Sequence, residues 1–245
     1  MVYDVRCNDE SPLWRSLAQP PMPLTKRARP TASRIALSRE RVLRAALALA
    51  DEARTETPAM RNLAEILGVA PMALYRHVAN KEDLLDGLVD IVFGEIDLPT
   101  DGVGWKKAMH RRAISAHEVL LRHPWAIGLM ESRGNAGPAN LRHHDAVLGS
   151  LRRAGFSVAM AAHAYSVLDS YVYGFAMNQK SLPFDSSDVA DIAESMLKQF
   201  PVDTYPYLAE IMFEHVMKPG YDYANEFEFG LDLVLEGLER MYDKA

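Results

Sequence analysis

Cysteine is almost absent from this chain of 245 residues, which has only Cys7. A single cysteine excludes an intramolecular disulfide and a zinc site built from several cysteines, and it suits a reducing compartment, so we expect a cytoplasmic protein. Long apolar runs are missing as well. The nearest candidate, residues 159–177, is interrupted by His163 and Asp169, so neither a membrane helix nor a membrane partner is predicted. The first ten residues lack the apolar region of a signal peptide, and none is expected.

An alternating strand pattern of useful length is also missing, whereas apolar residues recur at helical spacing from Ser38 onward. We therefore predict an all-α protein. Residues 1–37 hold five of the fourteen prolines and are predicted to be a disordered arm. The break near residues 99–103 separates a predicted N-terminal domain, 38–98, from a C-terminal domain, 99–245. The predicted helices cover 38–52, 58–67, 71–78, 80–96, 104–122, 139–154, 158–180, 187–199, 205–217 and 223–243.

Positive charge is scarce in the whole chain, whose net charge is −6, but it is concentrated in one segment. Residues 26–81 carry 11 lysines and arginines against 5 acidic residues, whereas residues 82–245 carry 14 against 25. A basic segment followed by a long acidic region indicates a nucleic-acid-binding module joined to a part with another task.

The basic segment contains the spacing of a helix-turn-helix. Two short helices pack at a steep angle only where their backbones approach closely, and Ala64 supplies the small residue that this needs. Four residues later, Gly68 allows the positive φ of a sharp turn. Leu74 follows ten residues after Ala64 as the buried aliphatic contact. The spacing predicts a three-helix DNA-binding domain, although helical hairpins without a DNA role share it.

Around this spacing the sequence resembles the TetR family of transcriptional repressors. The resemblance is carried by residues 60–69, MRNLAEILGV, and residues 74–85, LYRHVANKEDLL. It continues more loosely through residues 123–125, HPW, residues 153–157, RAGFS, and residues 226–232, EFEFGLD, which are similar to the sensor domain of tetracycline repressors. It implies a DNA-binding regulator with a helical C-terminal domain.

The resemblance also implies which residues contact DNA. Side chains matching Tyr75, His77 and Lys81 touch phosphates in the family, and one matching Arg61 can read a guanine edge. Relatives begin the recognition helix with polar residues. Here Met72 offers only apolar contact, for instance with a thymine methyl group. The predicted DNA-contacting residues are Arg61, Pro71, Met72, Ala73, Tyr75, Arg76, His77 and Lys81.

In such a regulator the C-terminal region forms a helical bundle that dimerises and holds a small effector. Apolar residues at helical spacing in 158–180 and 223–243 place the homodimer interface on these helices, with Val234 and Leu238 in it. Ordinary core packing within one chain is the alternative. Polar and methionine side chains on the apolar helices are candidates for the effector site. They are Met109, His117, Met130, His144, Asp169, Tyr173 and Met177.

No metal or other cofactor is predicted. His110 and His117 lie seven residues apart, which is a weak signal for a metal site. Asn178 stands where the tetracycline repressor has the carboxylate that holds its magnesium-bound drug, so a tetracycline–metal chelate is not the expected effector.

The leading hypothesis is a repressor that binds a palindromic operator as a homodimer and leaves it when the effector binds. A DNA-binding protein without ligand control is one alternative. An all-helical enzyme such as a hydrolase is another, but the sequence has neither a G-x-S-x-G motif nor a phosphate-binding glycine loop.

Overall fold

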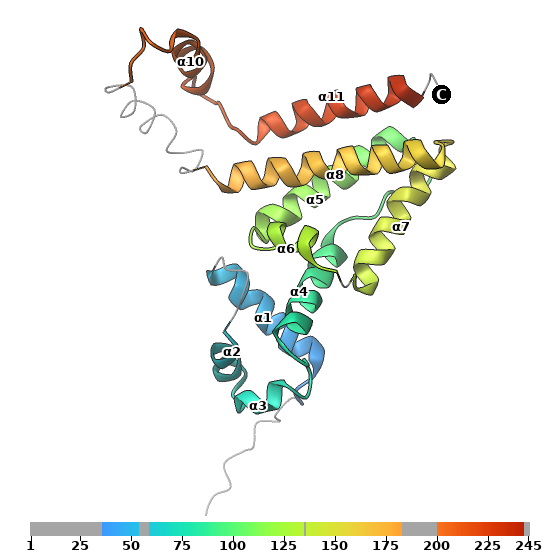
Figure 1. Cartoon of the computed structure of the whole chain (residues 1–245), viewed down its shortest axis with the longest axis vertical. Helices are drawn as coiled ribbons and strands as arrows, with labels where there is room; N and C mark the ends of the chain where they lie inside the picture. Colours follow the sequence, from blue (N-terminus) through green and yellow to red (C-terminus); the bar gives the residue numbers. More distant parts are fainter. Residues whose placement is uncertain (1–35, 54–58, 135, 183–199, 243–245) are drawn as a thin grey trace, which may run out of the picture. The chain divides into compact units, whose positions relative to one another are not determined.

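The computed structural model describes residues 36–53, 59–134, 136–182 and 200–242 (Figure 1). Every regular element within these ranges is a helix, so the all-α prediction is confirmed. The predicted helix 187–199 lies outside the described residues, as does the predicted arm except for its last two residues. From Leu37 onward the described residues form one compact unit, and the predicted boundary near residue 98 falls between two of its helices.

The N-terminal part consists of four helices: α1 (Arg39–Ala53), α2 (Met60–Leu67), α3 (Pro71–Leu74) and α4 (Lys81–Glu95). Local side-chain chemistry starts α1 and α4. The Ser38 hydroxyl accepts a hydrogen bond from the N–H of Arg41 at 3.2 Å, and the Asn80 side chain accepts one from the N–H of Asp83 at 2.8 Å. Both satisfy backbone donors that a helix N-terminus leaves unpaired.

Two of these helices differ from their predicted bounds. α2 begins at Met60 rather than residue 58, with Ala59 as an N-cap that makes no side-chain hydrogen bond. Pro58, the first residue of the predicted helix 58–67, lies outside the described residues. α3 ends at Leu74 rather than near residue 78, because the N–H of His77 bonds to the carbonyl of Leu74 three residues back, at 2.8 Å. Such tighter hydrogen bonds turn the chain toward α4.

Within the described residues, the C-terminal part adds seven helical elements. Four were predicted nearly as found: α5 (Trp105–Arg122), α7 (Pro138–Arg153), α8 (Val158–Lys180) and α11 (Asn225–Tyr242). The predicted helix 205–217 is divided into α10 (Pro206–Ile211) and a turn of π-helix, η2 (Met212–Val216). The sequence analysis missed α6 (Ile127–Ser132), whose six residues are too few to show a helical period.

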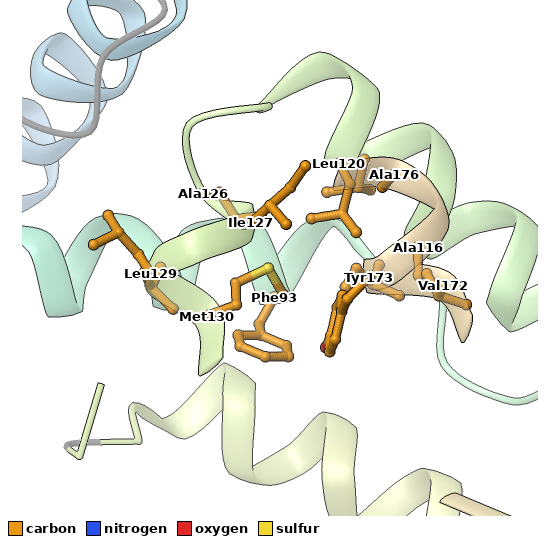
Figure 2. Close-up of a cluster of buried hydrophobic side chains, with 14 of the residues drawn as sticks. Phe93, Ala116, Leu120, Ala126, Ile127, Leu129, Met130, Val172, Tyr173 and Ala176 are labelled. Carbon is orange, nitrogen blue, oxygen red and sulfur yellow. The ribbon is translucent and has the colours of Figure 1, made fainter. Parts of the chain in front are cut away.

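Packing joins these helices into one core. α5 lies against α8, α11 packs on both, and α4 packs against α7 and α6. Figure 2 shows where α4, α5, α6 and α8 meet, with Phe93 of α4 facing Met130 of α6 and Tyr173 of α8. Trp125, Phe156 and Phe227 are among the largest completely buried side chains. None of the described helices is long and apolar enough to cross a membrane.

Candidate DNA-binding face and effector site

The corner between α2 and α3 has the predicted construction. Gly68 has a φ of 64°, and its N–H bonds to the carbonyl of Glu65 while the N–H of Val69 bonds to that of Ala64. Ala64 is 1% exposed, and Leu63 and Leu74 are completely buried. A left-handed residue after the helix thus ends α2, and buried aliphatic side chains fix α3 against it.

Most of the predicted DNA-contacting side chains are exposed around this corner. Met72 is 74% exposed and Tyr75 is 45% exposed, although Leu74 between them is buried. Ala73 and His77 are half-buried, and the carbonyl of His77 accepts a hydrogen bond from Arg39 at 3.0 Å. The remaining predicted residues are all exposed: Arg61, Pro71, Arg76 and Lys81.

An ion pair fixes the beginning of α4 to α1. The Arg39 guanidinium donates to both carboxylate oxygens of Asp83, at 2.6 and 2.8 Å. Asp83 also accepts a hydrogen bond from the N–H of Ala79 at 2.8 Å. The hydrogen bond from Arg39 is the main reason why the pKa of Asp83 lies below its usual value. The chain segment that carries Lys81 is therefore held in place by charged hydrogen bonds.

The predicted effector residues differ in burial. Met109, Met130 and Tyr173 are buried in the core, and Asp169 is 6% exposed. Met177 is 50% exposed and so does not line an interior site. Met177 lies four residues after Tyr173, on nearly the same side of α8, but its side chain is exposed close to the end of that helix.

The two predicted histidines are occupied by contacts within the chain. The ring of His117 stacks on Phe227 with centroids 4.0 Å apart, and its Nε2 lies 2.8 Å from Oε1 of Gln179. Burial lowers the pKa of His117, and this histidine joins α5 to α8 and α11. His144 is half-buried, with Nδ1 2.8 Å from the carbonyl oxygen of Asn140.

The structure assembles a buried polar cluster that the sequence analysis found only in part. It consists of Arg112 of α5, His143 of α7, and Tyr165 and Asp169 of α8. Nη1 of Arg112 donates to Asp169 at 2.5 Å, and Nε donates to Nε2 of His143 at 3.1 Å. Of these four residues only Asp169 was predicted. The missed signal is Arg112 itself, a charged residue within the apolar face formed by Met109, Ala113 and Ala116.

Burial is the main cause of the pKa shifts of His143 and Tyr165. It lowers the pKa of His143 to about 3, with a further contribution from the positive charge of Arg112. The pKa of Tyr165 is raised, first by burial and then by the negative charge of Asp169 and a hydrogen bond to it. At neutral pH the imidazole of His143 and the phenol of Tyr165 are therefore both neutral.

Polar contacts made by Asp86 and Asp90 help to attach α4 to the C-terminal helices. Asp86 forms an ion pair with Arg133, which follows α6. Asp90 accepts hydrogen bonds from the N–H groups of Ala139 and Asn140 at 2.8 and 2.9 Å. These donors belong to the first turn of α7, where a carboxylate is favourable.

An apolar face remains exposed on α8 and α11, but it does not include the predicted interface residues. Leu238 is 6% exposed and lies in the core of its own chain, and Val234 is partly buried against that core. Leu238 thus fits the alternative of ordinary core packing within one chain, and a role of these two residues in a dimer stays a prediction. Exposed apolar side chains on one side of α8 are Val167 and Met177, and those on α11 are Phe229, Leu233 and Met241; we call these five residues the α8–α11 face.

Among the described residues, no three histidine, cysteine or acidic side chains are grouped so that they could hold a metal ion. His110 lies 3.7 Å from Asp232, while His117 is engaged with Gln179.

Comparison with known proteins agrees with this architecture. Residues 98–242 match the family model of the tetracycline repressor-like C-terminal domain. The chain is 32% identical to the transcriptional repressor DrrR1 of Streptomyces coeruleorubidus, over 83% of this chain and 77% of the repressor. It is 31% identical to the class C tetracycline repressor protein of Escherichia coli, over 84% of this chain and 92% of that protein.

A solved structure supports the same assignment. The TetR family protein ActR of Streptomyces coelicolor, in complex with actinorhodin, has a TM-score of 0.69 and 26% identity, covering 84% of this chain and 99% of ActR. The relatives are regulators of transcription rather than enzymes. With an all-helical fold, a helix-turn-helix corner and these relatives, the chain belongs to the TetR family of transcriptional regulators.

Proposed function

We propose that this regulator binds a palindromic DNA operator as a homodimer and is released from it by a small effector. The observation that carries the DNA-binding part is the outer face of α3. Met72 on α3 and Tyr75 directly after it are exposed, whereas Leu74 of the same helix is buried in the corner. A short helix fixed on one side and open on the other fits the major groove, where Met72 can contact a thymine methyl group.

Charged residues around α3 supply the phosphate contacts of this proposal. Arg76 and Lys81 are exposed on the segments that follow α3, and Arg61 is exposed on α2. Phosphate contacts fix the position of a protein on the duplex, whereas a base contact determines sequence preference. We assign Lys81 to the first role and Arg61 to the second.

The α8–α11 face supports the homodimer. Phe229 is 66% exposed, Leu233 is 57% exposed and Met177 is 50% exposed. Several large exposed apolar side chains on two helices that pack together commonly mark an interface. A two-fold dimer through this face presents two copies of α3 to two half-sites, which is why a palindrome is the expected operator.

The effector part of the proposal depends on the interior between α4, α5, α7 and α8. The buried polar cluster lies there, and ActR, the relative with a similar structure, is complexed with actinorhodin. α4 contacts α6 and α7 at its middle and carries Lys81 at its beginning. An effector that displaces α7 would tilt α4 and change the separation of the two α3 helices, and its binding would then weaken operator binding.

The proposal is tested by selecting duplexes from a random pool with the purified protein and titrating the best duplex at several salt concentrations. We expect an inverted repeat and a logarithmic affinity that falls steeply with the logarithm of salt, by about 0.9 per phosphate contact. Lys81→Ala should reduce this slope, and Arg61→Ala should relax the base preference at one position, by about 1–3 kcal/mol. Lys107→Ala, an exposed substitution on α5, is the matched control and should change neither.

Failure to select any duplex at low salt would overturn the DNA-binding proposal. If a selected duplex binds but no stabilising ligand changes its affinity, the protein is a DNA-binding regulator without ligand control.

A further inference from the structure

Arg112 is the central residue of the buried polar cluster. Its side chain is 1% exposed, and it lies between Asp169 of α8 and His143 of α7. The contact with Asp169 balances its charge, because an isolated guanidinium at this depth would be strongly unfavourable. The contact with Nε2 of His143 is unusual, because a positively charged donor here approaches an imidazole nitrogen rather than an oxygen.

This contact determines the tautomer of His143. Arg112 is always protonated, so its Nε carries hydrogen and must be the donor. Nε2 of His143 is then the acceptor, and the single ring proton resides on Nδ1. The imidazole is neutral, in agreement with a pKa lowered to about 3.

Two atoms of the cluster have no hydrogen-bond partner among the described residues: Nη2 of Arg112 and Nδ1 of His143. Both carry hydrogen, so both are donors. The carboxylate of Asp169 already accepts hydrogen bonds from Nη1 of Arg112 and from Tyr165. A buried donor without a partner costs free energy and is rare in native proteins. The cluster therefore contains two buried N–H donors that have no acceptor among the described residues.

Aromatic rings surround these donors. Phe93 lies with its ring centroid 5.6 Å from that of His143 and 5.5 Å from that of His144. The ring of His144 lies 5.3 Å from Tyr165. Rings at such distances offer faces and edges to a further aromatic ring. A ligand beside the free donors would therefore meet aromatic side chains from α4, α7 and α8.

We infer that the effector is a neutral aromatic compound with a carbonyl oxygen, which accepts hydrogen bonds from Nη2 of Arg112 and, through the same or a second oxygen, from Nδ1 of His143. The inference rests on the proposed effector control and names the chemical class. A carbonyl fits because it accepts without donating. A neutral ligand fits because Asp169 already balances Arg112, so a carboxylate would bring an uncompensated charge into the interior.

Three related compounds serve as probes of this site. 9-Fluorenone has a carbonyl group, fluorene replaces it with a methylene group, and fluorene-9-carboxylate carries a negative charge. We expect the full-length protein to bind 9-fluorenone about 10- to 100-fold more tightly than fluorene, the range for a hydrogen bond to a charged donor. Calorimetric titration measures the three affinities. Equal affinity for fluorenone and fluorene, including no binding of either, overturns the inference, and tighter binding of the carboxylate overturns its neutral part.

Substitutions of Arg112 and His143 test whether these residues cause the preference for fluorenone over fluorene. Arg112→Lys keeps a positive charge beside Asp169 but cannot keep the planar set of donors, so the fluorenone preference should fall to about one with fluorene binding retained. His143→Gln keeps an acceptor for Arg112 and an N–H donor, and it should retain more of the preference than His143→Phe. If Arg112→Lys does not fold, the ¹⁵N resonances of His143 in the natural protein provide the test of the inference instead. They should show a proton on Nδ1 and a shift of Nδ1 when fluorenone binds, and absence of that shift would overturn the inference.

These experiments distinguish failure of the inferred ligand class from failure of the proposed function. If fluorenone binds as expected but does not release the selected duplex, the site assignment stands and the control of DNA binding fails. If another ligand releases the duplex while fluorenone shows no preference, ligand control stands and the chemical class is wrong.

Discussion

The carboxylate of Asp51, on α1, lies 2.7 Å from Nδ1 of His123, which directly follows α5. The same oxygen accepts a hydrogen bond from the indole N–H of Trp125 at 2.7 Å. One side chain of the DNA-binding part is thus the acceptor for two groups of the C-terminal part. Nε2 of His123 lies 3.1 Å from Glu95 at the end of α4, so this histidine joins α1 and α4 to the segment between α5 and α6.

Asp51→Ala should be strongly destabilising, because it removes one acceptor and leaves two donors without partners. We expect a loss of about 2–3 kcal/mol in the free energy of unfolding, measured by urea denaturation. Asp51→Asn keeps an oxygen at the same place and should recover part of the loss. Equal stability of the alanine variant and the natural protein would contradict this role of Asp51.

The proposed dimer interface is tested by comparing three leucines. Leu233→Glu alters the exposed α8–α11 face and should give a folded monomer, since an apolar interface does not accommodate an unpaired charge. Leu238→Glu puts the charge into the core of one chain and should impair folding itself. Leu141→Glu, on the exposed surface of α7, is the control. Light scattering measures the mass and circular dichroism the helix content; a folded Leu233→Glu dimer would exclude this face.

Stability should depend on pH through His143. The folded protein holds its pKa at about 3, whereas the unfolded chain titrates near 6.5. Between these values the unfolded state binds more protons, so the free energy of unfolding rises with pH through this window and the contribution is complete above it. The slope from one histidine is at most about 1.4 kcal/mol per pH unit.

His143→Gln has no titrating group at this position, so its stability should fall less steeply between pH 6 and pH 4. Urea denaturation of both proteins across this range measures the two slopes. Parallel slopes would mean that His143 takes up its proton as readily in the folded protein as in the unfolded chain.

Two glycines should respond to alanine in opposite directions. Gly68 has a φ of 64° and open space around the position of a Cβ, so Gly68→Ala should cost about 1–2 kcal/mol for its backbone conformation alone. Gly94 lies within α4, and a Cβ there would meet Ala139 at an ordinary 3.6 Å. Gly94→Ala should stabilise by about 0.5–1 kcal/mol. Thermal unfolding measures both, and a stabilised Gly68→Ala variant would be incompatible with the observed turn.

The sequence alone determined the helical fold class, the corner between α2 and α3, and the family. These features rest on local rules: the helical period of apolar residues, glycine at a left-handed turn, and a polar cap at Asn80. Local rules also limit which helices and helix ends the sequence can predict. The six residues of α6 show no period, and α3 ends early where the N–H groups of Arg76 and His77 bond over three residues rather than four.

Only the tertiary structure determined which residues lie together in the interior. Arg112, His143 and Asp169 lie 26 to 57 residues apart in the sequence, and only the packing of α5, α7 and α8 brings them together. The sequence pattern marks a residue as apolar or polar, but not whether its partner lies in the same chain or outside it. That is why Leu238 was placed in an interface and lies in the core, and why the unpaired donors of Arg112 and His143 appear only when all their neighbours are in place.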